Sequence, residues 1–303
     1  MKVFIAIPTY NGGALWETAV NNIKKYAPKE TFVQVIDSGS KDSTVNIAVK
    51  AGFNVISISS SDFNHGETRN KAVNTNIDQF DIVIFLTQDA VPKAGFIENI
   101  IGAFSDELVA CAYGRQLPHP DATPIAEHAR SFNYPDVGHV CDRSSAKTMG
   151  LKSVFMSNSF SAYRIDIFKE LGGFPNNTIL CEDMFFAAKA LLAGYKSVYV
   201  ASATVEHSHN YTAIEEFKRY FDIGVFHSDQ PWIKKEFGGA GGEGKKFIFS
   251  ELSYLFPKGI FWLVKSSVNN MMKIIGYKLG GQYKKLPIVF VKKLSMHAKY
   301  WSN

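Results

Sequence analysis

A short run of five apolar residues, Ile82 to Leu86, constrains the fold of this chain more than any other stretch. Three of the five are β-branched, which predicts a strand buried on both faces of a parallel sheet. Because such a strand cannot hold a carboxylate in its interior, Asp89 is expected just past its carboxyl end, where open α/β sheets form their ligand crevice. Pro92 is expected to end the strand and open a helix that carries apolar residues at helical spacing over 96–104.

Apolar runs of the same kind recur through the first 113 residues. Strands are expected at residues 3–7, 32–36, 55–58, 82–86 and 108–113. Strand and helix then alternate four times, which predicts an α/β fold with a doubly wound, mostly parallel sheet. The first crossover contains no GxGxxG pattern, so a dinucleotide-binding Rossmann domain is disfavoured.

The expected strand ends are followed by polar side chains suited to a nucleotide. They are Thr9 and Asn11, Asp37, Arg69, and Asp89. A role in turn formation explains any one of them alone, whereas the same position at several strand ends favours a shared site. A carboxylate can accept from the imide N–H of a pyrimidine or hold a divalent metal, and a guanidinium can neutralise a diphosphate.

Two further sets of side chains lie in the second half of the chain, after a proline-rich, loop-rich segment over 114–150. Glu182 and Asp183 open a helix expected over 182–192, where acids also simply complement the helix dipole. Strands are expected before and after that helix, at residues 155–163 and 196–200. His207 and His209 follow the second strand as His-x-His, a pattern that structural or exposed histidines also produce.

Charge and composition set the tail apart from the rest of the chain. The formal net charge is +5, but the residues from 252 onward hold nine lysines and no Asp, Glu or Arg, so the remainder sums to −4. We expect a catalytic domain over 1–237 (with halves 1–113 and 114–237), a glycine-rich hinge over 238–244 and a basic, aromatic-rich extension over 245–303. Two interpretations of the extension stay open, a helical subdomain packed on the domain or a segment that docks on anionic lipid.

The compartment is also constrained by the sequence. Three widely spaced cysteines without a CxxC pair favour free thiols in a reducing compartment. The first apolar run is too short for a signal peptide, and no uninterrupted apolar stretch approaches the ~20 residues that span a bilayer. A cytoplasmic protein, in peripheral contact with the membrane at most, is therefore expected.

Five motifs, in order over roughly residues 1–230, resemble those of family 2 inverting glycosyltransferases with the GT-A fold. The motifs are Pro8-Thr9-Tyr10-Asn11, Asp37-Ser38-Gly39-Ser40-Lys41-Asp42-Ser43-Thr44, Arg69-Asn70, Thr87-Gln88-Asp89 and Glu182-Asp183. The resemblance implies a GT-A fold and transfer of a sugar from a nucleotide-sugar donor. It also implies which residues bind the donor nucleotide: Pro8, Thr9, Tyr10, Asn11, Asp37, Arg69, Gln88 and Asp89.

The resemblance further implies a metal and a catalytic base. Asp89 matches the last acid of the family's DxD motif, although Thr87 replaces the first acid. His207 resembles the histidine that completes the metal shell with Asp89, and an imidazole with a carboxylate suits Mn²⁺, with Mg²⁺ as the other candidate. Asp183 is favoured as the base that deprotonates the acceptor, with Glu182 orienting the acceptor or a neighbouring loop.

A narrower resemblance concerns the bacterial rhamnosyltransferase branch, which uses dTDP-L-rhamnose to build O-antigen, cell-wall or capsular polysaccharides. It is carried by His65-Gly66-Glu67-Thr68-Arg69-Asn70, Thr87-Gln88-Asp89-Ala90, Gly114-Arg115-Gln116 and His207-Ser208-His209-Asn210-Tyr211. It implies dTDP-rhamnose as donor, a glycan or polyprenyl-linked acceptor, and no nucleic acid partner. The alternatives are a UDP-hexose donor, a non-catalytic sugar-nucleotide-binding module, and a nucleotidyltransferase, which would need a glycine-rich phosphate loop after the first strand.

Overall fold

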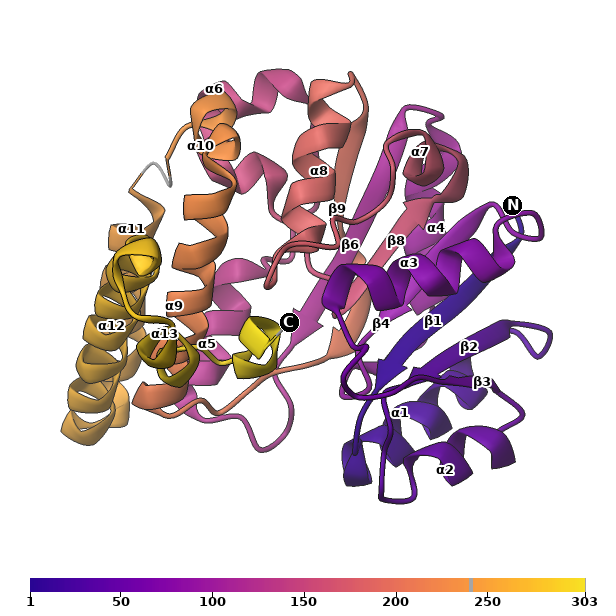
Figure 1. Cartoon of the computed structure of the whole chain (residues 1–303), viewed down its shortest axis with the longest axis horizontal. Helices are drawn as coiled ribbons and strands as arrows, with labels where there is room; N and C mark the ends of the chain where they lie inside the picture. The colour runs from indigo at the N-terminus through magenta and orange to yellow at the C-terminus, as the bar shows by residue number, and fades with distance from the viewer. Residues whose placement is uncertain (240–241, 303) are drawn as a thin grey trace.

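The computed structural model describes residues 1–239 and 242–302, which form a nine-stranded sheet with helices on both faces (Figure 1). The sheet order is β3-β2-β1-β4-β8-β6-β9-β5, and β7 pairs with β9. The strands are β1 (Val3–Thr9), β2 (Phe32–Asp37), β3 (Asn54–Ser57), β4 (Ile82–Leu86), β5 (Val91–Pro92), β6 (Val109–Leu117), β7 (His139–Cys141), β8 (Phe160–Arg164) and β9 (Lys196–Glu206). The expected doubly wound α/β fold is confirmed.

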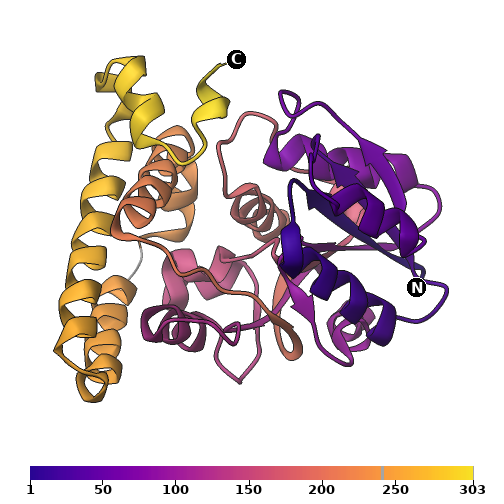
Figure 2. The same ribbon diagram turned by 90° about the horizontal axis from the view of Figure 1, so that it is seen from below.

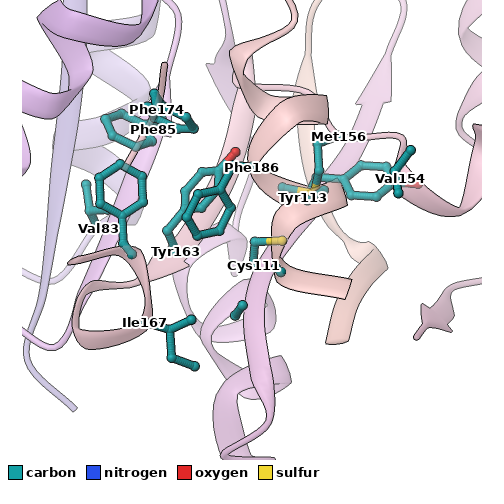
Figure 3. Close-up of a cluster of buried hydrophobic side chains, with 14 of the residues drawn as sticks. Val83, Phe85, Cys111, Tyr113, Val154, Met156, Tyr163, Ile167, Phe174 and Phe186 are labelled. Atoms are coloured by element: carbon teal, nitrogen blue, oxygen red, sulfur yellow. The ribbon is translucent and has the colours of Figure 1, made fainter. Parts of the chain in front are cut away.

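Strand β4 lies inside the sheet, as its sequence predicts, parallel to β1 and antiparallel to β8. Its side chains alternate between two cores, so every residue of the strand is buried. Val83 and Phe85 face a cluster with α3 (His65–Asn76), α7 (Ile165–Glu170) and α8 (Glu182–Leu192) (Figure 3). The other three residues of β4 face a second cluster with α1 (Gly13–Tyr26), α2 (Thr44–Lys50) and α4 (Phe96–Gly102).

The two expected halves of the domain share this sheet. β6 runs across the expected boundary at residue 113, and its neighbour β8 pairs with β4 of the first half. The expected 155–163 strand begins later, at Phe160, while the one expected over 196–200 continues as β9 to Glu206. This extension carries the chain straight to His207, whose N–H donates to the Leu117 carbonyl (2.8 Å).

Two expectations based on proline are wrong. Pro92 does not open a helix; with Val91 it forms β5, which pairs with β9, and α4 begins after Gly95, whose φ is +76°. The loop-rich segment over 114–150 contains α5 (Pro124–Asn133) as well as β7. Pro124 starts that helix because the first turn tolerates a missing N–H, and Thr123 caps it.

The C-terminal part of the chain forms a helical layer at the edge of the molecule (Figure 2). It consists of α9 (Ala213–Asp229), α10 (Pro231–Phe237), α11 (Glu243–Leu255), α12 (Ile260–Gly280) and α13 (Ile288–Leu294). α12 packs so closely on α9 that a Cβ on Gly276 or Gly280 would clash with the carbonyl oxygens of Phe217 and Phe221. Glycine at these two positions therefore permits the close contact. Within the described residues, no helix is long and apolar enough to cross a membrane.

The expected hinge over 238–244 is shorter than predicted, because α11 already begins at Glu243. Residues 240 and 241 of the hinge lie outside the described residues. After α13 the chain turns back from the helical layer towards the middle of the molecule (Figures 1 and 2).

Candidate active site

The carboxyl ends of β1 and β2 form one wall of the candidate site. Thr9 and Asp37 are register partners on these strands, and the Thr9 hydroxyl donates to Asp37 Oδ1 (3.0 Å). The second carboxylate oxygen of Asp37 accepts from the N–H groups of Gly39 (3.0 Å) and Ser40 (2.9 Å). The carboxylate is therefore buried and fixed by the loop that follows it.

The loop after β1 joins this wall to the end of β4. Gln88 holds the backbone of Tyr10 from both sides, accepting from its N–H (2.7 Å) and donating to its carbonyl (3.1 Å). Asn11, with a φ of +47°, donates its N–H to the Ser40 hydroxyl and accepts from the N–H of Lys41 (both 2.8 Å). Most of the predicted donor residues are thus brought together: Pro8, Thr9, Tyr10, Asn11, Asp37, Gln88 and Asp89.

Asp89 lies opposite two histidines that follow β9. Its carboxylate is 3.5 Å from His207 Nε2 and 3.7 Å from His209 Nε2. The three ligand atoms lie within 4.8 Å of one another, so one oxygen and two nitrogens converge on a single point. This set fits a divalent transition metal, since imidazole nitrogen and carboxylate oxygen are its common ligands. The predicted pair of Asp89 and His207 comes together, and His209 joins it.

The protonation states suit metal binding. Burial opposes ionisation of Asp89, but the adjacent His207 and His209 outweigh it and hold the pKa of the carboxyl well below its usual range. Burial lowers the pKa of His207, and burial with the neighbouring His207 lowers that of His209 to about 4. At neutral pH the site therefore presents one carboxylate and two neutral imidazoles.

Gln116 on β6 fixes the orientation of His207. Its Oε1 accepts from Arg130 Nη1 (2.5 Å), which identifies this atom as the oxygen because a guanidinium only donates. The same oxygen is 2.8 Å from His207 Nδ1, so Nδ1 carries the ring proton. Nε2, the nitrogen that faces Asp89, is left with a free lone pair.

The acid pair at the start of α8 has two different environments. Glu182 is buried, pairs with Arg69 (3.2 Å) and accepts from the Asn158 amide (2.8 Å). Asp183 keeps part of its surface exposed, but its carboxylate is largely surrounded by protein and accepts from the N–H groups of Asn158 (3.0 Å) and Met184 (2.7 Å). Cys181, just before the pair, has a φ of +60°, a strained conformation for a residue with a side chain, as occurs at functional sites.

The pKa values of the two acids move in opposite directions. Burial and the charge of Glu182 raise the pKa of Asp183 to about 7. For Glu182, burial works against the charged form, but Arg69 and His65 outweigh it and keep its pKa low. Near neutral pH, Asp183 is therefore the carboxyl that can exchange a proton, and Glu182 stays ionised.

Residues 157–159 connect the metal cluster with the acid pair. The Ser157 hydroxyl accepts from the amide of Gln116 (2.8 Å), Asn158 holds both acids, and the Ser159 carbonyl accepts from the N–H of Thr87 (3.3 Å). Sequence reasoning missed Asn158, and it assigned no role to His209 or Gln116 although both stood within the quoted motifs.

Several buried polar atoms after β2 and β4 and on α3 have no hydrogen-bond partner among the described residues. They include Ser38 Oγ, Thr87 Oγ1, His65 Nε2 and Arg69 Nε. Unsatisfied buried groups are costly, and a polar ligand bound at the site could satisfy those beside it. The other contacts of Arg69, from its Nη1 to Glu182 and to the His65 carbonyl (2.9 Å), stay within the protein.

Comparison with known proteins gives the family. The model described as "Glycosyl transferase family 2" matches residues 4–172, more than half of the chain. The chain belongs to glycosyl transferase family 2. It is therefore a glycosyltransferase, as the ordered motifs predicted.

Two relatives match this glycosyltransferase over almost its whole length. It is 50% identical over 305 residues to O-antigen chain rhamnosyltransferase RfbN of Salmonella typhimurium, covering 100% of this chain and 97% of the relative. It is 48% identical over 301 residues to O-antigen chain rhamnosyltransferase WbaN of Salmonella anatum, covering 99% and 95%. The predicted resemblance to the rhamnosyltransferase branch is confirmed.

Solved structures confirm the GT-A fold class. A mannosyltransferase from Pyrobaculum calidifontis, solved with GDP-Man and Mn²⁺, superposes with a TM-score of 0.64 at 14% identity, covering 94% of this chain and 88% of that one. TarS of S. aureus (residues 1–349), solved with UDP, gives a TM-score of 0.54 at 15% identity and covers 94% and 91%. At these identities the likeness concerns the fold alone.

Proposed function

We propose that this protein is an inverting rhamnosyltransferase of O-antigen synthesis that transfers L-rhamnose from dTDP-L-rhamnose to a glycan or polyprenyl-linked saccharide. The observation that carries the proposal is the near full-length match, at 50% and 48% identity, to two O-antigen chain rhamnosyltransferases. The geometry supports it, since an ionised Asp89 between two neutral imidazoles and an Asp183 that titrates near neutrality supply the two functions that such a transfer needs.

Asp183 acts as the general base. It takes the proton of the acceptor hydroxyl as that oxygen forms a bond to the anomeric carbon of rhamnose. On the opposite face of the sugar, the bond between the anomeric carbon and the diphosphate oxygen breaks, and dTDP leaves with the bonding electrons. One displacement therefore inverts the anomeric configuration. A pKa near 7 suits this task, because about half of the carboxyl groups are ionised at neutral pH and the carboxylate is basic enough to take a proton.

Asp89, His207 and His209 would hold a divalent cation, Mn²⁺ or Mg²⁺. When bound, the cation supplies positive charge for the diphosphate leaving group. Gln116 supports this set by keeping the metal-binding nitrogen of His207 deprotonated. The nitrogen-rich set compensates for Thr87, which stands where an acid would provide another oxygen ligand.

Glu182 is a positioning residue in this account. Its contacts with Arg69 and the side chain of Asn158 hold the backbone N–H of Asn158 against Asp183. The nucleotide is expected between the loop after β1 and the end of β2, where Pro8, Thr9, Tyr10, Asn11 and Asp37 lie. The binding of the donor diphosphate by Arg69 stays a prediction: its Nη1 is engaged with Glu182, and its Nε has no partner among the described residues.

The function is tested by incubating the purified protein with dTDP-L-rhamnose or UDP-glucose, with and without Mn²⁺. We expect saturable binding of dTDP-L-rhamnose and slow metal-dependent release of dTDP by transfer to water, with much weaker release of UDP from UDP-glucose. Preferential turnover of UDP-glucose would replace the proposed donor. Binding of dTDP-rhamnose without any turnover, even with a rhamnose-accepting lipid-linked saccharide, would contradict the enzymatic proposal.

We also propose that the C-terminal helical layer docks on the anionic cytoplasmic face of the membrane, which would bring the site to a lipid-linked acceptor. Four phenylalanines of this layer are more than half exposed: Phe249, Phe256, Phe261 and Phe290. Three of them, Phe256, Phe261 and Phe290, lie in the segment from residue 252 onward, which holds nine lysines and no acids, so the surface of this segment is complementary to anionic lipid. The packing of α12 on α9 is compatible with this role, because the exposed side chains lie away from that contact.

Flotation with vesicles tests the membrane proposal. At low salt the protein should float with phosphatidylglycerol vesicles and not with pure phosphatidylcholine, and added salt should release it. The double variant Phe256→Glu/Phe261→Glu should stay unbound, whereas Val137→Glu, an exposed apolar site outside the layer, should float like the wild type. Absence of flotation of the wild type at low salt would refute the proposal.

A further inference from the structure

The segment after α13, residues 295–301, crosses from the helical layer to the active site, and we call it the strap (Figures 1 and 2). Asp222 of α9, which is fully buried, accepts from the backbone N–H groups of Met296 (3.0 Å) and His297 (3.1 Å). Further along, the Tyr300 hydroxyl donates to the carbonyl of Asn177, in the loop before α8 (2.9 Å). The strap is thus fixed at both ends by contacts with the glycosyltransferase domain.

The strap brings two basic side chains to the site. The His297 ring packs edge-on against His65 at the start of α3, with 4.8 Å between ring centroids. Lys299 reaches the loop after β1, where its Nζ lies 5.5 Å from the centroid of the Tyr10 ring. This contact joins residues 289 positions apart in sequence, and Tyr10 is the residue whose backbone is held by Gln88, the neighbour of Asp89.

Among the described residues, Lys299 has no counter-charge. Its side chain is exposed, and no carboxylate of the described residues lies within ion-pairing distance of it. A cation over an exposed tyrosine contributes only about 0.5–1 kcal/mol, so the contact with Tyr10 is easily exchanged for a stronger one. An ammonium group on a flexible stem is suited to a phosphate oxygen, with which it forms a charge-assisted hydrogen bond.

We propose that Lys299 of the strap binds the diphosphate of the nucleotide donor, so that the end of the chain completes a site whose other residues lie on the sheet. This inference rests on the proposed function, since it requires a nucleotide donor bound beside Tyr10. It adds a donor-binding residue that no strand-end pattern indicates. It also makes donor affinity depend on the contacts that hold the strap, from Asp222 and Asn177.

Calorimetric titration of dTDP in the presence of Mn²⁺ tests the role of Lys299 in the full-length protein. Lys299→Ala should weaken dTDP binding about tenfold, the expected loss for one charge-assisted hydrogen bond, and Lys299→Arg should retain most of the affinity. Lys25→Ala is the matched control, because Lys25 lies over the ring of Tyr26 in a similar contact at the other end of α1. It should bind dTDP like the wild type.

Titration of thymidine, followed by nuclear magnetic resonance, separates the phosphate from the base. Thymidine should bind Lys299→Ala and the wild type equally, because it lacks the diphosphate. Unchanged dTDP affinity in Lys299→Ala, or an equal loss of affinity for thymidine, would overturn the role of Lys299 and leave the proposed donor intact. A wild-type protein that binds no thymidine nucleotide would overturn both.

Discussion

Asp89 and Asp183 are the same residue type in one site, yet their surroundings drive them in opposite directions. Asp89 faces two imidazoles, and its pKa lies well below the usual range despite burial. Asp183 faces a second carboxylate, and burial with that charge raises its pKa to about 7. One group is therefore a permanent anion suited to a metal, and the other is a base poised near neutrality. The difference teaches that the partners of a carboxylate, more than its exposure, decide its function here.

Removing the base of this pair, Asp183, should have the largest effect on the rate of transfer. Asp183→Asn preserves size but cannot accept a proton, so transfer should fall by about 10²–10⁴. Because Asp183 does not contact the nucleotide in this account, dTDP affinity should be unchanged, which calorimetry checks alongside the transfer rate.

Glu182→Gln is the matched control for the base. It keeps an oxygen for Asn158 and loses only the charge that faces Arg69, so transfer should fall less than in Asp183→Asn. Normal transfer by Asp183→Asn together with an inactive Glu182→Gln would reverse the two roles. If both variants transfer normally, this acid pair is not the site of catalysis.

Removing the permanent anion, Asp89, should lower the rate of transfer by weakening metal binding. Asp89→Ala leaves two neutral histidines without their carboxylate, and transfer should fall by about 10²–10³. In contrast to Asp183→Asn, this variant should also lose tight Mn²⁺ binding, measured by electron paramagnetic resonance. A correctly folded Asp89→Ala protein with near-wild-type turnover would show that Asp89 has no role in the reaction.

A smaller effect is expected from the residue that orients His207. Gln116→Ala removes the acceptor for His207 Nδ1–H, so the imidazole loses its fixed tautomer, and Mn²⁺ affinity should fall about 10–100-fold. Gln116→Glu keeps an accepting oxygen between Arg130 and His207 and should retain most of the affinity. Equal Mn²⁺ binding by Gln116→Ala and the wild type would show that His207 needs no such support.

The parts of this site that could be predicted from the sequence lie directly after strands or at a helix start. β4 was bounded correctly because its apolar run admits only a buried strand, and polar residues just after a parallel strand necessarily collect at one edge of the sheet. The choice of Asp183 as the base could be predicted from its position at the start of α8 together with the family resemblance.

The contacts that could not be predicted join residues far apart in sequence. Gln116 meets His207 across 91 positions and His65 meets His297 across 232, and no local pattern encodes such pairs. The length of β9 was missed because Ala201, Ser202 and Ala203 lack the apolar alternation of a strand. They lie in a register shift of the pairing with β6, between Val200 and Thr204, and the pairing that resumes at Thr204 continues the strand. Likewise, the ion pair of Arg69 with Glu182 was not predicted, because the two residues lie 113 positions apart.

The pH dependence of kcat/KM for the wild-type enzyme tests the contrast between Asp89 and Asp183 most directly. Asp183 must be ionised to take the proton, and its pKa is raised to about 7, whereas Asp89 stays ionised far below that pH. The rate should therefore fall tenfold for each pH unit below an inflection near pH 7, and level off above it. A rate that stays flat from pH 8 to pH 5 would contradict the assignment of Asp183 as a base with a raised pKa.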